Sequence, residues 1–148
     1  VLAGDISSKY ARMIINIVND RHLQERVIIP GTVSENDKLF LYKNCSAFLF
    51  PSRVEGFGLP VIEAMRFGKP VFISDKTSLP EIGGDLAYYW NNFNPDYMAD
   101  IFRSKMEEYK ENQEAMKNDI IEYSKKYDWK KSINQYADLY LEVLNNQK

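Results

Sequence analysis

One stretch of the chain combines residue types that hold anions with types that hold hydroxyl groups. Residues 51–65 read PSRVEGFGLPVIEAM, and Glu55, Gly56, Gly58 and Glu63 are the members that suit a ligand. Glycines let a backbone approach a ligand closely, and the N–H groups and dipole at a helix start favour an anion such as phosphate. A carboxylate accepts hydrogen bonds from two hydroxyls at once, as a sugar diol offers. The layout predicts a phosphate flanked by hydroxyl-rich groups, which is the shape of a nucleotide sugar.

Each part of this pattern is weak by itself. Gly-x-Gly is neither a Walker loop nor a full dinucleotide fingerprint, and two glutamates eight apart mean little among 21 acidic residues. In the plainer interpretation, Glu55 is a surface acid and Glu63 interacts with the helix dipole from the first turn. Gly56 and Gly58 then only permit a tight turn.

Alternating strand and helix patterns indicate how this stretch is positioned. Short runs rich in Val, Ile and Phe lack period-2 alternation, which is typical of parallel strands covered on both faces. We therefore expect an α/β fold: a Rossmann-like open parallel sheet with helices on both faces and extra C-terminal helices. The motif would join a strand's carboxyl end to a helix start, where such sheets bind ligands. The expected strands are residues 1–3, 27–29, 46–50, 70–73 and 86–90.

Local signals place the helix ends. Ser34 predicts the cap of a helix over residues 35–43, and Pro60 predicts the first turn of a helix that Gly68 ends. Ser78 and Glu81 have the spacing of a capping box. The chain is helical after Pro95, and the apolar stripe of the last helix is expected in the core, or partly exposed where a missing companion domain would cover it. That stripe consists of Trp129, Ile133, Tyr136, Ala137, Tyr140, Leu141 and Leu144.

The longer pattern resembles a known family. Residues 55–60 (EGFGLP), 63–65 (EAM) and 68–71 (GKPV) are together similar to the signature of family 4 retaining glycosyltransferases. Those enzymes have two Rossmann-like domains in the GT-B arrangement. The similarity extends over nearly the whole chain, through residues 31–33, 48–52, 74–82 and 127–129. It implies that the chain is the C-terminal, nucleotide-sugar-binding domain of such an enzyme.

The resemblance also implies a role for each matching residue. Glu55 would be the catalytic residue that holds a hydroxyl of the transferred sugar, and Glu63 would hold the ribose hydroxyls. The loop of Gly31 and Val33 would meet the base. The sugar and the diphosphate would lie against the backbone of Gly56, Phe57, Gly58 and Leu59.

Two charged residues are secondary candidates. Arg53 would assist the phosphates and Asp75 would contact the donor, although a solvated cation and a strand-ending residue are the plainer interpretations. The family's cationic pair for the diphosphate and its acceptor-binding domain match nothing here. Residues 1–148 are therefore expected to be one nucleotide-sugar-binding domain, a fragment without the acceptor domain and without its own first strand. The resemblance implies no cofactor and no metal ligands.

The composition of the chain limits the partners that it can bind. The net charge is −2, so no overall basic field attracts nucleic acid. The single cysteine, Cys45, indicates a reducing cytoplasm. Basic residues beside aromatics allow peripheral contact with the inner face of a membrane, against the simpler interpretation as a solvated helix end. These residues are Lys125, Lys126, Lys130 and Lys131.

Three functions from different classes fit these observations. The first is transfer of a sugar from a UDP-, GDP- or ADP-sugar to a hydroxyl of a glycan or lipid-linked acceptor, with retention of anomeric configuration. This chain would supply the donor-binding half and would have little activity alone. The second is a stand-alone α/β nucleotide-binding or interaction module without transfer activity. The third, a nucleotide-sugar epimerase, is disfavoured by the detailed match around residues 55–65.

Overall fold

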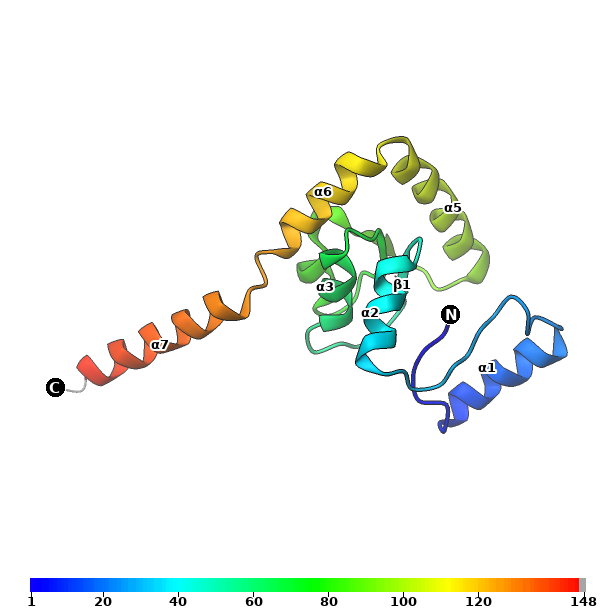
Figure 1. Cartoon of the computed structure of the whole chain (residues 1–148), viewed down its shortest axis with the longest axis horizontal. Coiled ribbons are helices and arrows are strands. Elements are labelled where there is room, and N and C mark those ends of the chain that lie inside the picture. The colour runs from blue at the N-terminus through cyan, green and yellow to red at the C-terminus, as the bar shows by residue number, and fades with distance from the viewer. Residues whose placement is uncertain (147–148) are drawn as a thin grey trace. The chain divides into compact units, whose positions relative to one another are not determined.

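The computed structural model describes residues 1–146 of the chain in two compact units, Val1–Lys43 and Asn44–Lys148. Figure 1 labels the helices and strands along the chain. In order they are α1 (Lys9–Asp20), α2 (Glu35–Asn44), β1 (Phe48–Phe50), α3 (Leu59–Arg66), β2 (Val71–Ser74), α4 (Leu79–Gly83), the 3₁₀ turn η1 (Gly84–Leu86), β3 (Tyr88–Trp90), α5 (Pro95–Glu111), α6 (Gln113–Ser124) and α7 (Trp129–Asn145).

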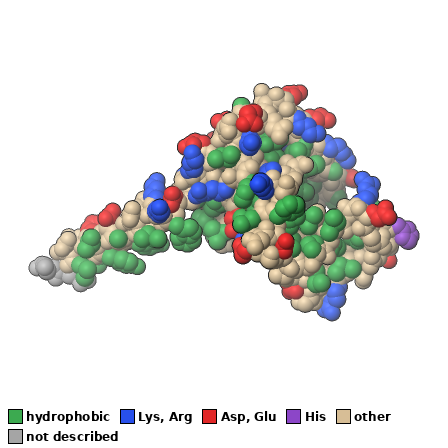
Figure 2. Space-filling view, viewed as in Figure 1, with side chains coloured by type: hydrophobic (Ala, Val, Ile, Leu, Met, Phe, Trp, Pro, Cys, Tyr) green, Lys and Arg blue, Asp and Glu red, His purple; other side chains and the backbone are tan. Residues whose placement is uncertain are grey.

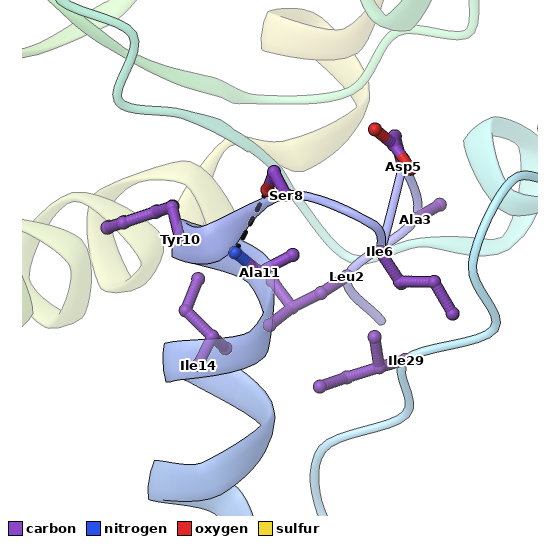
Figure 3. Close-up of a pocket in the computed structure, with 10 residues that line it drawn as sticks. Leu2, Ala3, Asp5, Ile6, Ser8, Tyr10, Ala11, Ile14 and Ile29 are labelled. Carbon is purple, nitrogen blue, oxygen red and sulfur yellow. Dashed lines mark hydrogen bonds between the residues drawn. The ribbon is translucent and has the colours of Figure 1, made fainter.

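The first unit contains α1 and almost all of α2. The Ser8 hydroxyl caps α1 by accepting a hydrogen bond from the Ala11 N–H at 3.1 Å. The Ser34 hydroxyl accepts one from the Asp37 N–H at 3.2 Å, so the predicted cap of α2 is confirmed. A mainly apolar hollow of about 200 Å³ lies beside the start of α1 (Figure 3). Its lining includes Leu2, Ala3, Ile6, Tyr10, Ile14 and Ile29.

The two strands expected in this unit are not formed. Residues 1–3 and 27–29 have no strand assignment, although the Leu2 N–H donates to the Ile28 carbonyl at 2.8 Å. Ala3 makes one parallel bridge with Gly31. Pro30 lies between these two contacts and has no N–H to donate, so the ladder is interrupted. The apolar runs predicted extended backbone correctly but did not predict this break.

The second unit contains the sheet. Its strands lie in the order β1-β2-β3 and both pairs are parallel, with Phe48 opposite Val71 and Phe72 opposite Tyr88. β1 and β3 are shorter than predicted, because residues 46–47 precede the paired positions and η1 occupies residue 86, and β2 is shifted by one residue. The parallel α/β class is confirmed.

Helices cover both faces of this sheet. Phe72 of β2 is fully buried and packs on one side with Phe102 and Met106 of α5. Ile73, next along the strand, lies on the other side against Gly83 of α4. Successive side chains of a strand point to opposite faces, so burial of all of β2 requires both helix layers. β2 is therefore the central strand of the sheet, and the loop after it starts at Asp75.

The last helix differs from the prediction. α7 begins at Asp128, whose carboxylate accepts a hydrogen bond from the Lys130 N–H at 2.8 Å. None of its described residues is buried, and the Trp129 side chain is 74% exposed. Figure 2 shows apolar side chains gathered along this helix. The 3.6-residue period predicted an amphipathic helix correctly, but the placement of its stripe in the core is wrong. The exposed members are Ile133, Tyr136, Tyr140, Leu141 and Leu144.

Candidate functional site

The site is built around the loop of residues 51–58, which joins β1 to α3. Gly58 precedes α3 with φ +109°, a conformation that L side chains rarely adopt. A Cβ on Gly58 would lie 2.9 Å from Cδ2 of the buried Leu79. The fold itself therefore requires glycine at position 58.

Gly56 has no such structural requirement. A Cβ at this position would meet nothing within 4 Å, and its φ lies outside the left-handed region. Alanine would therefore fit this backbone without strain. A glycine with open space on its Cβ side leaves room for a ligand to lie against the backbone.

Helix α3 presents its first turn beside this open space. It begins at Leu59 with Pro60 following, and its cap, Gly58, has no side chain to satisfy the first N–H groups. The first turn contains no acidic residue. The N-terminus therefore retains the partial positive charge that attracts an anion.

Glu63 lies one residue beyond the first turn, in which it was predicted. Because α3 starts at Leu59, Glu63 is its fifth residue and falls outside the first turn, which corrects the sequence interpretation. Its side chain is half-buried. Helical side chains generally lean towards the N-terminus, a direction that would bring the Glu63 side chain towards the turn after Gly58.

The end of β2 and the loop after it hold the motif loop through three hydroxyls, those of Ser74, Thr77 and Ser78, which we call the hydroxyl clamp. The Glu55 N–H donates to Thr77 Oγ1 at 3.1 Å. The Ser78 hydroxyl lies within donating distance of the Glu55 carbonyl, at 3.1 Å, and of the Phe57 carbonyl, at 2.9 Å. Both backbone polar groups of Glu55 are therefore held from one segment.

Part of this clamp differs from the prediction. Ser78 has the spacing of a capping box, yet it makes no side-chain hydrogen bond to α4. Its hydroxyl contacts the motif loop instead, because carbonyls 21 and 23 residues away compete for the same donor. The Thr77 contact was missed altogether. Nothing in the local sequence identifies a threonine that accepts from an N–H 22 residues earlier.

The two secondary candidates have structural partners. The Arg53 guanidinium lies over the Phe93 ring, 4.8 Å from its centre, on an exposed part of the loop. Asp75 follows β2, and its Oδ1 lies 2.7 Å from Lys76 Nζ. The Asp75 N–H donates to the Trp90 carbonyl at 3.3 Å, which agrees with a strand-ending role. Their ligand roles remain predictions.

Tyr127, between α6 and α7, contacts the motif loop, and Tyr89 of β3 contacts the segment of α4 and η1. Phe57 meets Tyr127 edge to face, with ring centres 5.9 Å apart. The Tyr127 hydroxyl donates to the Glu81 carbonyl at 3.0 Å, and burial raises the pKa of this tyrosine. Tyr89 donates to the Gly84 carbonyl at 2.6 Å, and burial raises its pKa to about 12. Both phenols stay neutral donors at ordinary pH.

The predicted site residues fall into two groups. The second unit contains most of them: Arg53, the run 55–59, Glu63 and Asp75. They lie in or near the motif loop and the start of α3. Gly31 and Val33 lie in the first unit, where Gly31 is buried and Val33 is half-buried. Among residues 1–146, no group of three or more potential metal ligands lies together. No helix in that range is long and apolar enough to cross a bilayer.

Comparison with known proteins identifies the class. The chain belongs to the family described as glycosyl transferases group 1, which it matches over residues 1–127. It is 32% identical to the serotype-specific mannosyltransferase WbdA of Escherichia coli, over 100% of this chain and 18% of that protein. It is 51% identical to the O-antigen chain mannosyltransferase B of Escherichia coli, over 37% of this chain and 14% of that protein.

Solved structures share the fold. The structure of Anabaena Alr3699/HepE in complex with UDP and glucose superposes with a TM-score of 0.76 at 20% identity, over 96% of this chain and 40% of that chain. The chain therefore has the Rossmann-like fold of a GT-B glycosyltransferase C-terminal domain. It spans less than a fifth of the WbdA mannosyltransferase.

Proposed function

We propose that this chain is the donor-binding half of a retaining glycosyltransferase that takes a nucleoside-diphosphate sugar. The observation that carries the proposal is Gly56. It adjoins Glu55, precedes the bare N-terminus of α3, and has open space where a side chain would stand. No demand of the fold explains a glycine there, whereas a sugar diphosphate against the backbone does.

Mannose is the sugar we propose for transfer. Several relatives are named as mannosyltransferases, and two of these are O-antigen chain mannosyltransferases by name. GDP-mannose is therefore the first donor to test, with UDP- and ADP-sugars as alternatives. The acceptor is a hydroxyl of a glycan or a lipid-linked glycan, and a companion domain would bind it. We place the reaction in the cytoplasm, at the inner face of a membrane, where a lone Cys45 stays reduced.

In the proposed reaction the bond from the anomeric carbon to the diphosphate oxygen breaks and a bond to the acceptor oxygen forms on the same face. The acceptor proton passes to the departing diphosphate. Glu55 holds a sugar hydroxyl and Glu63 holds the ribose hydroxyls. The N-terminus of α3 stabilises the negative charge that develops on the diphosphate. The contribution of these residues is orientation and charge stabilisation, and the proposal includes no metal or cofactor.

Titration of the 148-residue chain with GDP, UDP and ADP and their sugar conjugates tests the proposal. At ten times its dissociation constant, a ligand adds about 1.4 kcal/mol of stability, or roughly 3–6 °C in Tm. We expect one base to be preferred and the shift to vanish in Glu63→Ala. Glu107→Ala is the matched control, because Glu107 is an exposed glutamate on α5.

Two results would contradict the proposal. If Glu107→Ala lowers the shift as much as Glu63→Ala, the effect is general electrostatics and not ribose binding. If no nucleotide shifts the wild-type chain at millimolar concentration, the proposed donor site fails in this chain. The stand-alone interaction module would then replace the transferase as the better account.

A further inference from the structure

We infer that Thr77 and Ser78 of the hydroxyl clamp are positioning residues that set the place of Glu55 against the transferred sugar, and hence its sugar selectivity. The inference rests on the proposed function and deepens it. It assigns the sugar-specific part of binding to the loop after β2, separately from the diphosphate and ribose contacts at α3.

The first step is how Glu55 is held. Its N–H donates to Thr77 Oγ1 at 3.1 Å. Its carbonyl lies 3.1 Å from Ser78 Oγ, whose single proton it shares with the Phe57 carbonyl at 2.9 Å. The backbone on both sides of one Cα is thereby restrained, which limits the direction in which the side chain leaves the backbone. The carboxylate of Glu55 is not itself a partner in these bonds, so it stays available for a hydroxyl.

The second step is the strained backbone of Thr77. Thr77 has φ +52°, which is unusual for a β-branched residue and favours glycine or asparagine. Its side chain is exposed, so burial of its methyl group does not explain the choice. Glycine would fit this φ but would lack the hydroxyl that accepts the hydrogen bond from the Glu55 N–H. Strain retained at such a position is typical of functional sites.

The third step is that Ser78 and Ser74 use their hydroxyls in the same way. Ser78 adjoins the start of α4, yet its side chain does not cap that helix. Ser74 is fully buried, donates to the Ser52 carbonyl, and accepts from the Lys76 N–H at 3.4 Å. Three hydroxyls of one segment thus engage the loop on either side of the open space at Gly56.

The experiment separates sugar binding from nucleotide binding. Dissociation constants of the 148-residue chain are measured for GDP-mannose and for GDP, in wild type and in Thr77→Gly, Thr77→Ser and Glu55→Gln. Thr77→Gly removes the hydroxyl and also relieves the strain at φ +52°. We therefore expect its Tm to equal or exceed the wild-type value while GDP-mannose binding weakens roughly tenfold. GDP binding should stay within about twofold, and Thr77→Ser, which keeps the hydroxyl, should restore the sugar preference.

The double variant Thr77→Gly/Glu55→Gln gives a measurement that a purely structural role of Thr77 would not change. If Thr77 acts through Glu55, the sugar-dependent loss in Thr77→Gly/Glu55→Gln equals that of Glu55→Gln alone. Additive losses, or an equal loss of GDP and GDP-mannose affinity in Thr77→Gly, would overturn the positioning role and leave the donor site intact. If Glu55→Gln itself leaves the preference for GDP-mannose unchanged, the role of Glu55 in the proposed function fails, and the inference fails with it.

Discussion

Replacing each glycine of the motif loop by alanine separates what the fold demands from what the ligand demands. In Gly58→Ala, the new methyl group meets Leu79 Cδ2 at 2.9 Å and the backbone must hold a φ of +109°. In Gly56→Ala, the same methyl group enters open space at an ordinary φ. The two variants are chemically identical and lie two residues apart, so each serves as the control for the other.

The expected losses in the free energy of unfolding of the two variants differ by several kcal/mol. A left-handed alanine costs about 1–2 kcal/mol. A methyl group forced against a fully buried leucine adds about 1–3 kcal/mol, because Leu79 has little room to move. Gly58→Ala should therefore lose about 2–5 kcal/mol, or roughly 5–20 °C in Tm. Gly56→Ala should stay within about 0.5 kcal/mol of wild type, because alanine also restricts the unfolded chain.

Fluorescence of Trp90 during urea unfolding measures both changes in the second unit. Trp90 is 3% exposed, whereas the other tryptophan, Trp129, is already exposed and changes little on unfolding. Nucleotide-sugar titration of the same samples completes the test. Gly56→Ala should keep its stability and lose donor binding. Equal stability of the two variants would refute the steric argument, and undiminished donor binding by Gly56→Ala would refute the close approach of a ligand.

Two further predictions concern the scaffold. Burial raises the pKa values of Tyr88 and Tyr89 to about 12, above their usual value of 10. Because the unfolded chain loses these protons first, their contribution to stability should be constant below pH 10 and should be lost between pH 10 and 12. Tyr89→Phe should flatten that fall in a urea-unfolding series, and an unchanged slope would contradict it. Phe72→Ala should destabilise by about 3–5 kcal/mol through a cavity between Trp90 and Phe102, whereas Phe57→Ala on the exposed loop should cost much less in the same assay.

Much of the second unit was predictable because its signals are local. Pro60 at the start of α3 and Gly68 with φ +65° just beyond its end act through their own backbone conformations. The buried run of β2 identifies a central parallel strand, since no face of it meets water. The conformation of such residues can be predicted from the neighbouring sequence alone.

The features that escaped prediction depend on distant partners. The 3.6-residue period of α7 predicts an apolar stripe but not what covers it, and every described member of that stripe except Ala137 is among the exposed large hydrophobic residues. Ser78 has the same local pattern as a capping serine, yet two carbonyls of the motif loop take its hydroxyl. Thr77 gave no signal at all, because a left-handed threonine follows from the contact it makes and not from its neighbours in sequence.

The late position of Glu63 strengthens the case for an anionic ligand. Helices α1, α5 and α7 each begin with a side chain that accepts from a first-turn N–H. Helix α3 begins with Gly58 and carries no acid in its first turn. A glutamate in that turn would have satisfied the N-terminus from within the chain and competed with a phosphate for it. Placed just beyond that turn, Glu63 would leave the N–H groups to the proposed diphosphate, and its carboxylate would take the hydroxyls of the adjoining ribose.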